Sequence, residues 1–184
     1  KERIASAALN LFLKDGYHST SVREIAKKAD LSVGSVFNYF TNKEEILFFL
    51  LSYSQARAQS EIEQRRAEFE ASKERNVDPL DSFLFAYESY AVLNDELRRY
   101  TVLGYQETKS LTTAERKRIL AGENKIQKFF EDLISYGIER GAFPAGNIGL
   151  KAHCLVVLAQ SWAVRHWALS HFTKISEYFE PLKI

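Results

Sequence analysis

The most constraining feature of the chain is a pair of helix starts within residues 21–44, SVREIAKKADLSVGSVFNYFTNKE. Ser21 can accept a hydrogen bond from a free backbone N–H of the first turn. Glu24, three residues later, can accept one from the backbone N–H of Ser21, and this reciprocal pair is a capping box. The helical pattern breaks at Asp30, and Ser32 then offers a second N-cap. Two capped helices that follow each other this closely must cross steeply through a tight turn.

The first helix of this pair has an apolar side and a basic side. Its apolar residues recur at spacings of i, i+3, i+4 and i+7, which places them on one face: Val22, Ile25, Ala26 and Ala29. The basic residues Arg23, Lys27 and Lys28 fall on the other side. We therefore expect the apolar face to pack on a core while the basic side stays in solvent.

The second helix is predicted over residues 33–40 and begins with small residues, Val33-Gly34-Ser35. Small side chains let a helix approach base edges in a DNA groove closely, and Asn38 and Tyr39 are placed to reach bases or phosphates. These positions favour a recognition helix.

A third helix start follows at Thr41 or Asn42, and its N-terminal dipole together with Lys43 would attract a phosphate. The alternative interpretation is purely structural, because well-capped helical hairpins occur in many all-α proteins that never bind DNA.

The stretch from Ile4 to Leu47 resembles the N-terminal domain of the TetR family of transcriptional regulators. In that family a first helix ends in Phe and Gly, as Phe12 and Gly16 do here, and a Thr/Ser-Val-Arg-x-Ile-Ala helix follows, which residues 21–26 match. The next family block, Ser-x-Gly-Ser/Thr-hydrophobic-Tyr-x-Tyr/His-Phe-x-x-Lys-Glu, is matched by Ser32, Gly34, Ser35, Val36, Phe37, Tyr39, Phe40, Lys43 and Glu44.

The resemblance implies that the second of these helices is inserted into the DNA major groove. Arg23 would reach into the groove, residues 33–35 and Phe37 would face bases, and Tyr39 and Lys43 would bind phosphates. Relatives usually carry Tyr at the position of Phe37, so here only packing on a thymine methyl group remains possible. The complete set of predicted DNA-binding residues is Ser21, Arg23, Ser32, Val33, Gly34, Ser35, Phe37, Asn38, Tyr39 and Lys43.

The chain is long enough for a second core. Its 184 residues are more than one helix-turn-helix domain needs. Of these residues, 46% are hydrophobic and 13% aromatic, which is enough for a second core. The net charge is only +1, and residues 1–50 hold seven basic and six acidic residues, so no strong basic field indicates nucleic acid. We predict an all-α fold with a DNA-binding domain over residues 1–45 and a helical effector-binding and dimerisation domain over residues 46–184.

Helical patterns continue through this second region. A long linking helix without Gly or Pro is predicted from Lys43 to about Ser72, which could pass motion rigidly to the DNA-binding end. Asp78-Pro79 starts another helix, and Thr112 with Glu115 forms a second capping box. The predicted helices after the linking helix cover about 78–93, 96–107, 112–140, 149–170 and 176–182.

The helix predicted over residues 149–170 is apolar on more than one side, so something beyond its own domain should cover it. The TetR resemblance implies a homodimer in which the last two helices pair with their copies, and two recognition helices about 34 Å apart would suit a palindromic site. The alternative is that these residues form only a monomer's core. The predicted interface residues are Leu155, Leu158, Trp162, Tyr178, Phe179 and Leu182.

Small molecules bind the middle region of TetR relatives, and aromatic side chains with a few polar anchors are typical of such pockets. Plain core packing is the competing interpretation for each aromatic residue. Arg165 could pair with an anionic effector, such as an acyl thioester or an organic acid, or stack on a Trp at the dimer interface, which we favour. The candidate pocket residues are Phe83, Tyr87, Tyr90, Tyr105, Phe129, Phe130, Gln160, Trp162, Arg165 and His166.

Other classes of protein are disfavoured. The single cysteine, Cys154, cannot form an internal disulfide, and we expect it to be a small core residue in a reducing cytoplasm. The apolar runs are shorter than the roughly 20 residues that span a bilayer. His166 and His171 lack the spacing of metal ligands on one helix face, and no nucleophile–base pair appears. We predict no enzyme activity, metal or cofactor, and keep a helical protein-interaction adaptor as the alternative function.

Overall fold

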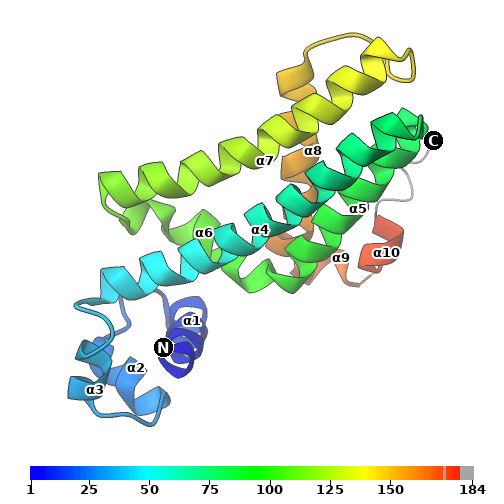
Figure 1. The fold of residues 1–184 in the computed structure, drawn as a ribbon. Helices are drawn as coiled ribbons and strands as arrows, with labels where there is room; N and C mark the ends of the chain where they lie inside the picture. The colour runs from blue at the N-terminus through cyan, green and yellow to red at the C-terminus, as the bar shows by residue number, and fades with distance from the viewer. Residues whose placement is uncertain (172, 179–184) are drawn as a thin grey trace. The chain divides into compact units, whose positions relative to one another are not determined.

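The structure is a computed structural model that describes residues 1–171 and 173–178, and it confirms the all-α prediction. The described residues contain helices and connecting turns but no strand. The elements, shown in Figure 1, are α1 (Glu2–Asp15), α2 (Val22–Lys28), α3 (Val33–Phe37), α4 (Lys43–Glu74), α5 (Pro79–Glu96), α6 (Arg98–Glu107), the 3-10 turn η1 (Thr108–Ser110), α7 (Thr113–Glu139), α8 (Ile148–Val164), α9 (His166–Leu169) and α10 (Ile175–Tyr178).

The described chain packs into two compact units. The first unit comprises residues 1–55 and 99–120, and the second comprises residues 56–98 with the described residues from 121 onward. Residues 46–55 and 99–120 thus pack with the helices of the predicted DNA-binding domain. The division of function at residue 45 stays a prediction.

The first unit is built around α1. Its buried residues Ile4, Ala8 and Phe12 pack with Ile25 of α2 and Val36 of α3, and each of these side chains is at most 2% exposed. The apolar front of α4 and Leu103 of α6 complete the same core. Only the inner faces of α2 and α3 are therefore covered.

The second unit has an aromatic core. Helix α8 packs against α5, and α10 also contacts α5. Tyr87, Tyr90, Phe129 and Phe130 are each at most 2% exposed, and Ala152 and Ala159 let α8 approach this cluster closely. None of the described helices is long and apolar enough to cross a membrane.

Most helix boundaries follow the predictions. Asn147 caps α8 by accepting from Leu150 N at 3.0 Å, and Gly141, with φ of 73°, follows the end of α7 in the left-handed conformation that glycine tolerates. The helix predicted over residues 149–170 is divided, because the backbone leaves helical geometry at Arg165 (φ −108°, ψ 16°) before α9 begins. Most of the last predicted helix, residues 179–182, lies outside the described residues.

Candidate nucleic-acid interface

The capping box predicted for α2 is confirmed. The Ser21 Oγ atom accepts from Glu24 N at 3.2 Å, while Glu24 Oε2 accepts from Ser21 N at 2.7 Å. The Ser21 hydroxyl also donates to Glu24 Oε2 at 2.7 Å, and this hydrogen bond together with the one from Ser21 N holds the pKa of Glu24 below its ordinary value. The cap fixes the residue at which α2 begins, and hence the direction in which Arg23 leaves the helix.

The turn between α2 and α3 is held from α1. Asp30 adopts φ of 55°, a left-handed conformation that Asp tolerates better than most residues. Arg3 Nη2 donates to Ala29 O at 2.6 Å and to Asp30 O at 3.2 Å. The guanidinium therefore binds carbonyl groups that the end of α2 leaves without helical partners. This long-range contact was not predicted, because Arg3 lies far from the turn in sequence.

Helix α3 starts where the sequence predicts and ends earlier. Ser32 Oγ accepts from Ser35 N at 3.0 Å, which confirms the N-cap. The helix ends at Phe37, and the N–H groups of Tyr39 and Phe40 both donate to Val36 O in a closing turn. Phe40 is buried in the same core as Val36.

The predicted DNA-binding residues lie on the outer side of this two-helix unit. Phe37 is 50% exposed and Tyr39 49% exposed, although both are aromatic. Arg23 is exposed and makes no hydrogen bond or ion pair with any described residue. The remaining exposed members are Ser21, Ser32, Gly34 and Asn38, and Val33, Ser35 and Lys43 are half-buried.

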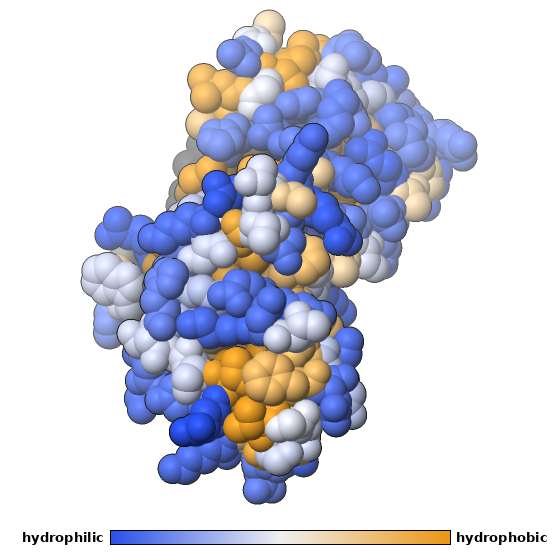
Figure 2. All heavy atoms as spheres, turned by 90° about the vertical axis from the view of Figure 1, so that its left-hand side faces the viewer, coloured by the Kyte–Doolittle hydropathy of each residue, from blue (hydrophilic) through white to orange (hydrophobic). Residues whose placement is uncertain are grey.

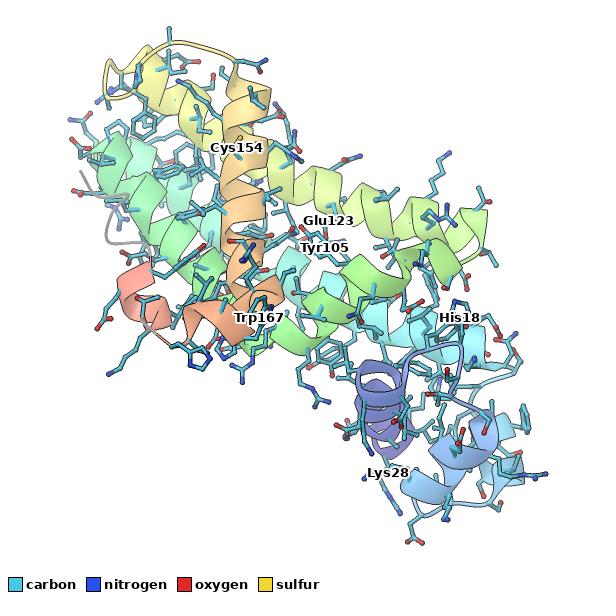
Figure 3. The ribbon with its side chains drawn as sticks, turned by 180° about the vertical axis from the view of Figure 1, so that it is seen from behind. His18, Lys28, Tyr105, Glu123, Cys154 and Trp167 are labelled. Atoms are coloured by element: carbon cyan, nitrogen blue, oxygen red, sulfur yellow. The ribbon has the colours of Figure 1, made fainter. Side chains whose placement is uncertain are left out.

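The surface around these residues combines apolar and hydrophilic groups. The lower part of Figure 2 shows apolar side chains bordered by strongly hydrophilic ones on this unit. Lys27 and Lys28 are exposed at the end of α2, and Figure 3 labels Lys28. An outer face with apolar and cationic groups suits base edges and phosphates respectively.

Lys43 is engaged inside the unit. Its ammonium group donates to Tyr17 O at 2.8 Å, Thr20 O at 2.9 Å and His18 O at 3.3 Å. Asn42, one of the two predicted caps of α4, accepts from Glu45 N at 2.7 Å. The phosphate contact predicted for Lys43 stays a prediction, and the structure gives the side chain other partners.

Comparison with known proteins identifies the family. Residues 4–48, which span α1 to the start of α4, match the tetR family of bacterial regulatory proteins. HbdR, an HTH-type transcriptional regulator of Aromatoleum sp. (strain CIB), is 31% identical over 180 residues, or 98% of this chain and 76% of HbdR. The chain belongs to the TetR family of transcriptional regulators. It is accordingly a regulator rather than an enzyme.

Solved TetR-family structures share the fold. PfmR from Thermus thermophilus has a TM-score of 0.84 and 23% identity, covering 98% of this chain and 94% of its own. AibR, in complex with isovaleryl coenzyme A and operator DNA, has a TM-score of 0.78 and 18% identity, covering 97% of this chain and 93% of its own.

In this TetR-family chain, most of the predicted pocket residues are buried in the second unit. Phe130 contacts the rings of Tyr87 at 5.9 Å, Tyr90 at 5.4 Å and Phe129 at 5.5 Å. The half-buried Phe83 stacks on Tyr87 at 5.8 Å. These rings pack on one another, and their assignment to an effector pocket stays a prediction.

The polar candidates divide between the core and the surface. Gln160 is buried and donates to Glu123 Oε2 at 3.2 Å, and Trp162 Nε1 donates to Asp95 Oδ1 at 2.8 Å. The ring of His166 meets Trp162 edge-on at 5.2 Å. Arg165 is exposed and its guanidinium carbon lies 5.9 Å from the centroid of the Trp167 ring, and the dimer interface predicted at this position stays a prediction.

Tyr105 lies on α6 in the first unit and is 58% exposed. A different feature in the second unit was not predicted. A groove of about 430 Å³ runs between α4 and α7, with the buried residues Ile62 and Ile126 among its lining and with Arg66 and Lys128 at its polar edge.

The outward face of α8 in the single chain includes residues beyond the predicted dimer interface, which stays a prediction. Leu155 and Leu158 pack against the core of the second unit, and Trp162 is only 3% exposed. Leu150 and Val157 point outward instead, with exposures of 58% and 40%. Tyr178 OH lies 2.8 Å from Ser161 Oγ. The other two predicted interface residues, Phe179 and Leu182, lie outside the described residues.

The prediction that Cys154 is a core residue is wrong, because the thiol is exposed. It lies one turn from Leu150 and nearly one turn from Val157, so it shares their outward face on α8. A helix with apolar residues on several sides does not reveal which of them meet the core.

Proposed function

We propose that this TetR-family regulator is a homodimeric repressor that binds a palindromic operator and is released by a small hydrophobic or amphipathic effector. The observation that carries the DNA-binding role is the outer face of α2 and α3. Arg23, Phe37 and Tyr39 are exposed there, next to capped helix starts, while the inner faces of the same helices are buried. A regulator of this kind acts on the genome, and we propose a cytoplasmic location.

The residues of this face divide by chemistry. A guanidinium such as that of Arg23 can pair with guanine, and Phe37 can pack on a thymine methyl group. Val33, Gly34 and Ser35 are small enough for close approach to base edges, whereas hydroxyl and amide groups suit phosphate oxygens. For phosphate contacts we propose Ser21, Ser32, Asn38 and Tyr39.

For the homodimer we propose that the outward face of α8 meets a second copy of the chain. This face presents Leu150, Cys154 and Val157 to solvent in the single chain, and burial of such apolar groups is the main source of association energy. A two-fold axis would bring two α3 helices to half-sites one helical turn of DNA apart, which requires a palindromic operator.

The effector is proposed to be hydrophobic or amphipathic. The groove offers an apolar floor with Ile62 and Ile126, and at its edge Arg66 and Lys128 form ion pairs with Asp132. AibR is a TetR-like protein solved with isovaleryl coenzyme A, an acyl thioester. An effector that binds the DNA-incompetent form more tightly lowers operator affinity by its differential binding free energy. Unchanged operator affinity at saturating effector would contradict this mechanism.

Selection of bound duplexes from a random DNA pool with the complete chain tests the DNA-binding proposal. We expect an enriched sequence with two inverted half-sites, and affinity for it that falls steeply between two salt concentrations. Enrichment of a single, non-repeated half-site would contradict the dimeric arrangement. The absence of any enriched or salt-sensitive binding would favour the protein-interaction adaptor.

A further inference from the structure

Lys43 is the first residue of α4, and its side chain turns back toward the loop between α1 and α2. The ammonium nitrogen lies 2.8, 3.3 and 2.9 Å from the carbonyl oxygens of Tyr17, His18 and Thr20. It also lies 4.5 Å from the centroid of the Tyr17 ring. Four groups of one loop therefore surround a single charge.

An ammonium group has three N–H donors and no acceptor. All three donors of Lys43 are used by the loop carbonyls, so none is left for a phosphate oxygen. We propose that Lys43 is a positioning residue, which sets the loop of residues 16–20 and the start of α2, and not a DNA contact. This inference rests on the proposed DNA-binding function.

The loop is the segment that places α2. Gly16 adopts φ of +87°, and Thr20 Oγ1 donates to Gly16 O at 2.8 Å, which closes the loop on itself. The next residue, Ser21, is the N-cap of α2. Because Thr20 O accepts from Lys43, the first turn of α4 is connected directly to the residue before the cap. Loss of the ammonium would leave three carbonyls without this donor and release the start of the helix that carries Arg23.

Two substitutions separate positioning from phosphate binding. Lys43→Arg keeps the charge and reach that a phosphate contact needs, but a planar guanidinium cannot occupy the place of a compact ammonium among three carbonyls. We expect Lys43→Arg and Lys43→Met each to lower affinity for the selected operator duplex by about tenfold, as expected if one molecule in ten holds a competent loop. The slope of log affinity against log salt should stay at the wild-type value in both. Loss of one phosphate contact from each subunit of the proposed dimer would make it shallower by about 1.8.

Amide hydrogen exchange of Ser21 and Glu24 is a readout that does not require DNA. Exchange at these two amides should accelerate in both Lys43 variants well below the melting temperature, because their hydrogen bonds form the α2 cap. Lys28→Met is the matched control, since it removes an exposed charge from α2 and should leave this exchange unchanged.

The outcomes are distinct. Wild-type affinity in Lys43→Arg, or a shallower salt slope in Lys43→Met with unchanged exchange, would overturn the proposal. If Lys43→Met does not fold, the affinity and exchange of Lys43→Arg decide. If the wild-type chain binds no duplex, the proposed function fails, while the exchange experiment still tests whether Lys43 holds the loop.

Discussion

Replacement of Ser32 by alanine tests whether the α3 cap controls DNA binding. Helix α3 has only five residues, and isolated helices of that length are unstable, so its order depends on tertiary packing and on its ends. The fully buried Val36 packs α3 against the core. The hydrogen bond from Ser35 N to Ser32 Oγ, at 3.0 Å, stabilises the N-terminal end of the helix. Loss of a Ser cap to Ala costs about 1 kcal/mol, which corresponds to roughly a fivefold loss of affinity for each half-site if α3 becomes ordered on binding DNA.

Glycine at the same position is the matched control, because Ser32 is also a proposed phosphate contact. A glycine N-cap costs only a few tenths of a kcal/mol relative to serine, yet it removes the same hydroxyl. We therefore expect Ser32→Ala to weaken binding about fivefold for each half-site and Ser32→Gly less than about twofold for each half-site. Fluorescence anisotropy with the selected duplex at one salt concentration measures both. Equal losses in the two variants would refute the capping argument and identify the hydroxyl as a DNA contact.

Three further predictions concern other parts of the chain. Arg23→Ala should lose roughly 1–3 kcal/mol of discrimination at one base position, measured with single-base operator variants; uniform weakening would indicate a phosphate contact instead. Val157→Glu would place a carboxylate in the proposed α8 interface and should shift the chain to monomers in sedimentation equilibrium; an unaltered dimer would place the interface elsewhere. In the folded state, hydrogen bonds from Ser21 lower the pKa of Glu24 below its ordinary value of 4.5. The contribution of the Glu24 carboxylate to folding stability is therefore present above pH 4.5 and is lost as the pH falls through the folded pKa. Urea unfolding of Glu24→Gln should accordingly show less loss of stability in that acid range, and a pH profile identical to the wild type would contradict this cause.

The features that sequence alone determined are the local ones. The capping box of Ser21 and Glu24 and the Ser32 cap were both predicted, and both involve atoms within one helical turn. Such hydrogen bonds depend only on which residues occupy a few neighbouring positions, and the sequence gives these directly. The position of Phe37 against the bases came from the family resemblance, and the side chain is 50% exposed.

Tertiary structure alone decided which partners distant residues find. The ammonium of Lys43 binds carbonyls more than twenty positions away, and Arg3 closes the turn at Asp30, at a similar separation. The rotation of α8 placed Cys154 outside and Leu155 inside, because packing against α5 chooses one face of a helix that is apolar on several. Local sequence specifies where a helix begins and ends, but the side that becomes core is set by how well its shape fits the neighbouring helix, and that fit exists only in the folded chain.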